Sequence, residues 1–330
     1  MKVKSGSALG QLSDMDIRLL RVFKSVVECG GMAAAELELN IGSSTVSRHI
    51  KDLETRLGLT LCRRGRAGFA LTAEGQQIYT ETLRLLAGAD AFRASVDEIH
   101  RRMGGQLNIA VFDKTASNPQ ARLGAAIALF SELAPEVNLH LYVAPLNAIE
   151  RGVIDGQFQV GVIPGHRNSD SLNYDELFDE TMQLYCGAQH ALFEAEPTQM
   201  SWDDLREHHF AGLGYHSPNM EISQQRRLSR KATGYDQESI ATLILSGEYL
   251  GFLPDHYAKA FVESGQMRAV KADLFHYECS FFSIVRRSPQ PSRAARAFQD
   301  CLLRAHSVSR ADRLPALQSD PADLESSCSS

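Results

Sequence analysis

The chain has 330 residues, of which 44% are hydrophobic, 8% aromatic and 22% charged, close to the averages of soluble globular proteins. These values exclude global disorder, and the length predicts more than one domain. No stretch approaches the roughly 18 apolar residues that a membrane-spanning helix needs, and residues 1–12 lack the apolar core of a secretion signal. We therefore expect a cytoplasmic protein with no membrane partner.

The net charge of −6 hides a difference in sign between the two ends of the chain. Residues 1–103 hold 15 Lys and Arg against 12 Asp and Glu, whereas residues 104–330 hold 19 against 28. Between residues 41 and 72 there are six basic residues and only two acidic ones. Because phosphates attract clustered positive charge, we expect a nucleic acid to bind this segment.

Six cysteines are spread along the chain without a CxxC pair or a Cys/His cluster of metal-ligand spacing. We interpret them as reduced, mostly buried thiols, and a redox switch that uses Cys186 and Cys279 remains the alternative. His208, His209 and His216 have no carboxylate or cysteine at a suitable spacing, so we expect no metal and no cofactor.

After a leader of residues 1–13, expected to be disordered, three helices are predicted. Ile17, Leu20, Phe23 and Val27 repeat at helical spacing, and the glycines at 30 and 31 end this helix. A short Ala-rich and Leu-rich segment at 32–39 leads to a turn at 40–42, where Asn and Gly tolerate a left-handed backbone. Two short helices that flank such a turn are typical of a helix-turn-helix.

In the following helix the apolar residues Val46, Ile50, Leu53 and Leu57 share one face, which leaves a polar face opposite them. Such a face is often merely solvated, but here the preceding turn favours insertion into a major groove. Residues 61–71 then predict two short strands around a Gly-rich basic turn, which is a wing. We expect base edges to be read by the start of the helix and phosphates to be held by the wing arginines. The candidate DNA-binding residues are Ser43, Ser44, Thr45, Arg48, Lys51, Arg63, Arg64 and Arg66.

The string Ser47-Arg48-x-Ile50-x-x-Leu53-Glu54-x-x-Leu57-Gly58-x-x-Leu61, followed by Arg64 and Leu71-Thr72-x-x-Gly75, resembles the DNA-binding signature of LysR-type transcriptional regulators. The chain departs from the family pattern at Ser43-Ser44, where Gln-Pro is common, and at Cys62, where Phe is usual. The resemblance implies a winged helix-turn-helix at residues 14–72.

Residues 73–103 predict one long helix that Thr72 caps. Apolar positions along it alternate spacings of four and three, which is a heptad seam that favours self-association, although a helix packed on its own domain is the alternative. The resemblance likewise implies dimers, which often pair into tetramers, and a dimer predicts a partly palindromic operator in double-stranded DNA. The candidate dimerisation residues are Ile78, Leu85, Ala89, Phe92, Val96 and Ile99.

From Gly105 onward, short strand patterns alternate with helical patterns, which predicts an α/β domain at residues 104–306. The patterns Gly105-x-Leu107-x-Ile109 and Gly247-x-x-Leu250-Gly251-Phe252-Leu253-Pro254 resemble the effector-binding domain of the same family. That resemblance implies a two-lobed fold like that of periplasmic binding proteins. Lobe I would contain residues 104–165 and 269–305, lobe II residues 166–268, and residues 307–330 are expected to form a disordered tail.

The resemblance places a small-molecule effector in a cleft between the lobes. Thr115 and Ser117 could instead cap a helix before Pro119, Phe252 could be plain core, and Asp113 and Lys114 could pair with each other or face water. The candidate effector-binding residues are Thr115, Ser117, Asn118, Ile163, Pro164, Leu213, Tyr215, His216 and Phe252.

The sequence therefore predicts an effector-controlled, sequence-specific transcriptional regulator that binds DNA. RNA polymerase is a further candidate partner. An enzyme is disfavoured because no GxSxG elbow, Walker loop, GxGxxG fingerprint or zinc signature is present. A redox-sensing regulator and a constitutive DNA binder with a vestigial cleft remain the alternatives.

Overall fold

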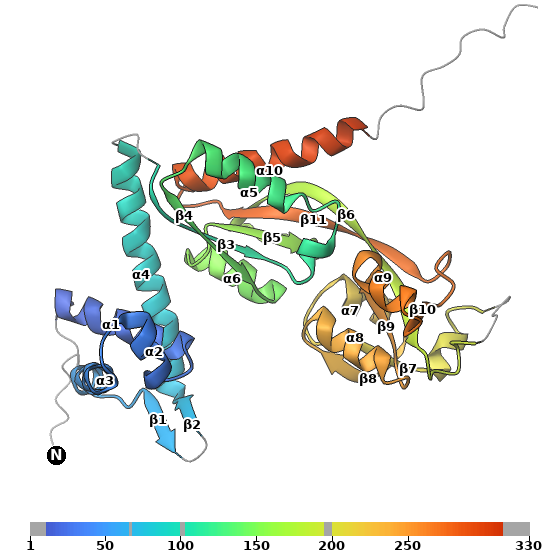
Figure 1. The fold of residues 1–330 in the computed structure, drawn as a ribbon, viewed down its shortest axis with the longest axis horizontal. Coiled ribbons are helices and arrows are strands. Elements are labelled where there is room, and N and C mark those ends of the chain that lie inside the picture. Colours follow the sequence, from blue (N-terminus) through green and yellow to red (C-terminus); the bar gives the residue numbers. More distant parts are fainter. Residues whose placement is uncertain (1–10, 66–67, 100–102, 195–199, 313–330) are drawn as a thin grey trace, which may run out of the picture. The chain divides into compact units, whose positions relative to one another are not determined.

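The computed structural model describes residues 11–65, 68–99, 103–194 and 200–312, which form two compact units, residues 1–93 and 94–330 (Figure 1). Within the described ranges, no helix has both the length and the apolar character needed to cross a membrane.

The first unit begins with three helices that pack on one another. They are α1 (Asp14–Glu28), α2 (Met32–Leu39) and α3 (Ser43–Leu57). Ser13 and Asp16 form a reciprocal capping box at the start of α1, and left-handed Asn40 turns the chain between α2 and α3. Phe23, Val46 and Leu53 are almost completely buried in the shared core. The predicted helix-turn-helix is confirmed.

The predicted wing is the antiparallel hairpin β1 (Cys62–Gly65) and β2 (Gly68–Leu71), in which Cys62 pairs with Leu71. The Glu54 side chain of α3 fixes the start of this hairpin, because its Oε1 accepts hydrogen bonds from the backbone nitrogens of Leu61 at 2.7 Å and Cys62 at 3.2 Å. A second tie joins α3 to α1, where Arg56 Nη2 donates to Asp16 Oδ2 at 2.9 Å. These bonds orient α3 and the wing as one piece.

Helix α4 (Ala73–Ile99) follows the wing, and Thr72 caps it as expected, since its Oγ1 accepts from the Gly75 nitrogen at 2.8 Å. The predicted seam divides into two parts. Ile78 and Leu85 are half-buried against the core of the first unit, whereas Phe92 and Val96 are 73% and 37% exposed. Ala89 is also exposed, and the Ile99 side chain and residues 100–102 lie outside the described residues.

The second unit is built on one mixed sheet with strand order β4-β3-β5-β11-β6-β9-β7-β8 and with β10 beside β6. The strands are β3 (Gly105–Val111), β4 (Val137–Val143), β5 (Val160–Pro164), β6 (Leu172–Gly187), β7 (His209–Leu213), β8 (Ser229–Gly234), β9 (Leu250–Pro254), β10 (Met267–Ala269) and β11 (His276–Arg286). The helices are η1 (Thr115–Ser117), α5 (Leu123–Leu133), α6 (Leu146–Asp155), η2 (Asp204–Glu207), α7 (Pro218–Gln225), α8 (Gln237–Leu245), α9 (Asp255–Glu263) and α10 (Arg293–Asp312).

The sheet carries two lobes, which confirms the predicted α/β architecture. Helices α5 and α10 lie against each other over one face of the first lobe, where Phe130 and Phe298 meet edge to face, and α6 covers the opposite face (Figure 1). Helices α7, α8 and α9 surround the strands of the second lobe (Figure 1).

Two long antiparallel strands, β6 and β11, belong to both lobes. The part of β11 at residues 281–284 pairs with β5 of the first lobe, whereas the later part of β6, at residues 182–185, pairs with β9 of the second. The lobe boundaries expected at 165/166 and 268/269 remain a proposal. The tail expected from residue 307 is wrong for residues 307–312, because α10 continues through Asp312, and residues 313–330 lie outside the described residues.

Gly75 tests how tightly α4 is joined to the wing. A Cβ atom at this position would lie 2.0 Å from the carbonyl oxygen of Leu61, so the backbone of one element must shift. We expect Gly75→Ala to destabilise the first unit by about 2–3 kcal/mol, measured as lost hydrogen-exchange protection in peptides from residues 43–80.

The matched control is Gly88→Ala on the same helix, where an added Cβ meets nothing within 4 Å. This change should stabilise α4 by about 0.5–1 kcal/mol, because Ala favours a helix over Gly. Equal effects of the two substitutions would contradict the close approach of Gly75 to Leu61.

Candidate nucleic-acid interface and effector site

The polar face of α3 is held away from the core. Val46, Ile50 and Leu53 are buried on one side of the helix, so Arg48 and Lys51 are exposed on the other. Neither of these two cations forms an ion pair with a described residue. Two unpaired cations on the second helix of a helix-turn-helix are available to phosphates and base edges.

The other candidate DNA-binding residues that the structure describes belong to α3 and to strand β1 of the wing. Ser43 and Ser44 are exposed in the first turn of α3, and Thr45 is half-buried. Arg63 is exposed on β1. Arg64 lies on the same strand, but its side chain is outside the described residues. Arg66 lies wholly outside the described residues.

A group of side chains from the two lobes meets at the ends of β3, β5 and β7. The Phe112 ring, which follows β3, lies edge to face against Tyr215, which follows β7, at 6.5 Å between centroids. His166, which follows β5, lies 5.5 Å from His216. Strand ends of an α/β sheet are the usual place for a ligand, and Tyr215 and His216 are two of the sequence candidates.

This interlobe cluster contains buried polar atoms with no partner. The hydroxyl of Tyr215 and Oε1 of Gln237 make no hydrogen bond to a described residue, although the two residues are only 9% and 2% exposed. Burying an unpaired polar group costs about 1–3 kcal/mol. Groups left unpaired in this way are well suited to hydrogen-bond a small polar molecule.

Charged groups flank the cluster on the lobe I side. The Glu150 carboxylate is 7% exposed and lies 3.6 Å from both His166 Nε2 and Arg167 Nη2. Burial raises the pKa of Glu150. Burial, together with the positive charge of Arg167, lowers the pKa of His166 to about 4. His166 is therefore neutral at physiological pH, with one ring nitrogen able to donate and the other able to accept.

Asp113 and Lys114 pair with each other, with Lys114 Nζ 3.9 Å from Asp113 Oδ1, and each also has a partner in the second lobe. Asp113 Oδ2 accepts a hydrogen bond from the Gln237 nitrogen at 2.6 Å, and Lys114 Nζ lies 2.5 Å from Glu238 Oε2 and over the Tyr257 ring. Both residues thus connect the loop after β3 with helices of the second lobe.

Three candidates on that loop have local or separate partners. The Thr115 hydroxyl donates to the carbonyl oxygen of Phe112, and the Ser117 hydroxyl donates to that of Lys114 at 2.9 Å. The capping alternative is wrong, because the N-cap residues of η1 and α5 are Lys114 and Arg122, and neither forms a side-chain cap hydrogen bond. Asn118 Nδ2 donates to Glu180 Oε2 at 3.4 Å. Thr115 is buried, so its hydroxyl is committed to the loop.

The apolar candidates are packed in the interior. Ile163, Leu213 and Phe252 are at most 2% exposed, and Pro164 is buried opposite Phe281 on β11. The expectation that their side chains line an accessible cleft is corrected for this structure. The reason is that Ile163 lies on the strand between β3 and β11, and that the Phe252 ring packs against aromatic neighbours, namely Trp202, Phe210 and Tyr277.

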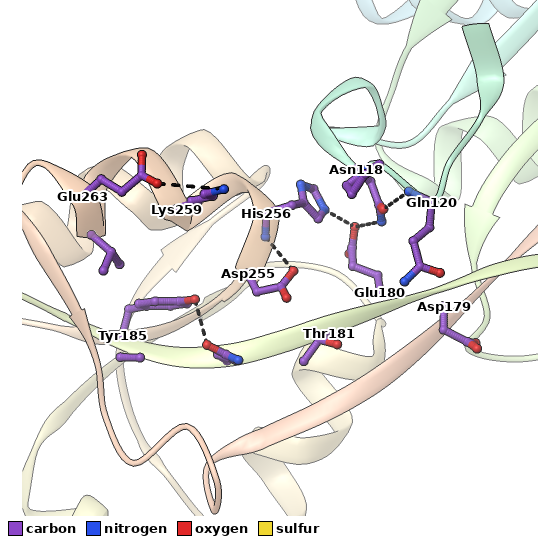
Figure 2. A pocket seen from close by; sticks show the side chains of 14 residues that line it. Asn118, Gln120, Asp179, Glu180, Thr181, Tyr185, Asp255, His256, Lys259 and Glu263 are labelled. Carbon is purple, nitrogen blue, oxygen red and sulfur yellow. Dashed lines mark hydrogen bonds and ion pairs between the residues drawn. The ribbon is translucent and has the colours of Figure 1, made fainter. Parts of the chain in front are cut away.

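A polar pocket of about 340 Å³ lies beside β6 at the junction of the lobes (Figure 2). Asn118 and Gln120 contribute to it from the loop after β3, Glu180 from β6, and His256 and Lys259 from α9. Sequence reasoning missed Glu180 and His256, just as it missed Glu150 and Gln237 in the interlobe cluster. Of these four residues, only His256 carried a local signal, since it lies two residues after the strand that ends at Pro254.

The thiols offer little support for a redox switch. Cys186 and Cys279 are buried, and burial raises the pKa of both, that of Cys186 to about 11. Because the thiolate is the reactive form, these two cysteines are poor redox sensors. Cys328 lies outside the described residues.

Comparisons with known proteins agree with this architecture. Residues 17–76 match the family described as bacterial regulatory helix-turn-helix protein, lysR family, and residues 100–307 match the LysR substrate binding domain. The HTH-type transcriptional activator BauR of Pseudomonas aeruginosa is 39% identical over 295 residues, which cover 89% of this chain and 97% of that protein.

Two solved structures share the fold at lower identity. CbnR, crystallised at full length with its target DNA, has a TM-score of 0.59 and 18% identity and is matched over 88% of this chain and 99% of its own. A full-length variant of AphB has a TM-score of 0.54 and 19% identity, over 87% of this chain and 97% of its own.

The fold thus defines a winged helix-turn-helix protein with a two-lobed substrate-binding domain. The chain belongs to the LysR family of transcriptional regulators. It is a DNA-binding regulator with an effector-binding domain, and its relatives are regulators rather than enzymes.

Proposed function

We propose that this protein reads a specific operator with the polar face of α3 and alters its action when a small polar effector binds between the lobes. The buried, unpaired Tyr215 hydroxyl and Gln237 carbonyl carry the second half of this proposal, because a ligand that pairs them removes a desolvation cost. A vestigial cleft would be expected to fill with apolar side chains instead.

In this mechanism the effector prefers one arrangement of the lobes and shifts the population toward it. The arrangement of the lobes then determines the relative placement of two DNA-binding units. This placement in turn determines how the two units contact their half-sites and a neighbouring RNA polymerase. The protein acts in the cytoplasm, where its DNA is. The description of BauR as an activator supports activation of the target genes.

Self-association through α4 supplies the second DNA-binding unit. Phe92 and Val96 are exposed apolar residues one turn apart, which a partner helix would cover. A dimer, or a pair of dimers, presents recognition helices in pairs, so the operator is partly palindromic.

Two arginine substitutions separate base reading from phosphate binding. Arg48→Ala should weaken binding to the specific duplex by about 1–3 kcal/mol more than binding to a random duplex, because a base-edge contact is lost. Arg63→Ala should weaken binding to both duplexes alike and reduce the magnitude of the slope of log K against log salt concentration by about one. Titrations by fluorescence anisotropy at several salt concentrations measure both quantities.

Arg151→Ala removes the same charge from the exposed surface of the second unit and serves as the control. It should leave both affinities unchanged. Wild-type discrimination in Arg48→Ala would exclude Arg48 from base reading.

Effector binding is tested by thermal-shift screening of a small-metabolite library. A ligand at 100 times its Kd stabilises the native state by about 2.7 kcal/mol. Tyr215→Phe should raise the Kd of that ligand about fivefold, since one hydrogen bond of roughly 1 kcal/mol is lost. Tyr142→Phe, at a 39% exposed tyrosine on β4, is the matched control. An unchanged affinity in Tyr215→Phe would place the ligand elsewhere.

Phe92→Glu tests the proposed dimer helix. A charge in the seam should favour the monomer and raise the dissociation constant of the dimer at least tenfold, as measured by sedimentation equilibrium. Leu37→Glu, on the 88% exposed Leu37 of α2, should keep the wild-type mass. A Phe92→Glu protein that associates as the wild type does would exclude this face of α4.

A further inference from the structure

The loop after β3 is fastened to the second lobe at three points. Asp113 accepts from the backbone nitrogen of Gln237 on α8, Lys114 pairs with Glu238 of the same helix, and Ser117 contacts His256 of α9. The first lobe is therefore held to the second through polar contacts rather than through apolar packing at these points.

His256 is the centre of the contact with α9. Its Nε2 lies 2.9 Å from Glu180 Oε2 on β6 (Figure 2). Its Nδ1 lies 3.0 Å from the Ser117 hydroxyl. The side chains of His256 and Glu180 are only 8% and 3% exposed. Asn118 also bonds to the Glu180 carboxylate, so four residues join the loop, the shared strand and the second lobe.

The hydrogens of this network can be counted. The Ser117 hydroxyl has a single hydrogen, which it donates to the carbonyl oxygen of Lys114, so its oxygen is left to accept from His256 Nδ1. An ionised Glu180 can only accept, so His256 Nε2 must also donate. These two bonds and the bond from Ser117 to Lys114 are all made only when the imidazole carries a hydrogen on each nitrogen, which is the charged form.

A neutral His256 has one N–H and must give up one of the two bonds or turn Ser117 away from Lys114. We propose that Ser117, His256 and Glu180 form a proton-operated clasp that holds the two lobes together while His256 is protonated and Glu180 is ionised. The clasp makes the effector response depend on pH, and in this respect it rests on the proposed function.

Several titratable groups surround the clasp. Asp255 lies next to His256 on α9 and accepts a hydrogen bond from its backbone nitrogen, and most other nearby charges already have partners. Burial raises the pKa of Tyr277 and Cys279 on β11, so both are neutral. The partnered groups are Asp179 with Ser280, Lys259 with Glu263, Lys114 with Glu238, and Thr181 with Glu278.

The pocket in Figure 2 gives protons access to the clasp. His256 and Glu180 line it, and Asp255, Lys259 and Glu263 at the pocket are exposed. Burial raises the pKa of Glu180, opposed by the hydrogen bond from His256. In the proposed clasp, protonation of Glu180 or loss of the second proton of His256 removes one charge of the pair.

The test follows hydrogen exchange of residues 113–120 in the full-length protein between pH 5.5 and 8.5, after correction for the intrinsic exchange rate. Neither effector nor DNA is added. Protection of this segment should fall at least fivefold as pH rises in the wild type, and it should be low and independent of pH in His256→Gln. His209→Gln, at an exposed histidine of the second lobe, should behave as the wild type.

Spectra of ¹³C-labelled histidine in the wild type report the charge of His256 directly, whether or not a variant folds. The fall in protection should follow the loss of that charge. A His256 that stays neutral throughout the range, or a His256→Gln protein with wild-type pH dependence, would overturn the proposal. Failure of the proposed function would instead appear as the absence of any stabilising metabolite, with the pH response of the loop intact.

Discussion

The whole effector-binding unit depends on the sharing of β6 and β11 between its lobes. Strand β11 pairs with β5 of the first lobe, β6 pairs with β9 of the second, and β6 and β11 pair with each other, so the ladder between these two strands joins the lobes. Contacts across the junction add to this ladder. The loop after β3 supplies such contacts through Asp113, Lys114 and Ser117, beside the interlobe cluster where an effector is proposed to bind.

The DNA-binding unit obeys a similar constraint at smaller scale. Glu54 binds the first backbone nitrogens of the wing, and the absence of a side chain at Gly75 lets α4 approach Leu61. The recognition helix, the wing and the first turns of α4 consequently form one rigid piece. A change in the relation of two α4 helices would then reorient the recognition helices without deforming them, which suits a regulator that keeps its base contacts.

Local patterns predicted most of the fold because they reflect local physics. The apolar spacing of Val46, Ile50 and Leu53 and the turn at Asn40 were sufficient for the helix-turn-helix, and strand-helix alternation was sufficient for the α/β unit. The effector site was harder, because it depends on which strand ends meet. Ile163 and Phe252 follow the family's spacing yet lie in the core, while Glu150 and Gln237 look like ordinary helix residues until the lobes bring them together. Asn118 was assigned to the effector cleft, but its partner Glu180 is 62 residues away in the sequence.

The central claim is that this chain binds one DNA sequence as a symmetric assembly. Selection of bound duplexes from a genomic fragment library tests it most directly, with purified full-length protein at near-physiological salt and with random competitor present. The account predicts enrichment of a short, partly palindromic motif, with half-sites about one helical turn apart or a multiple of it. Recovery of fragments with no common motif, from protein shown to be folded, would contradict it.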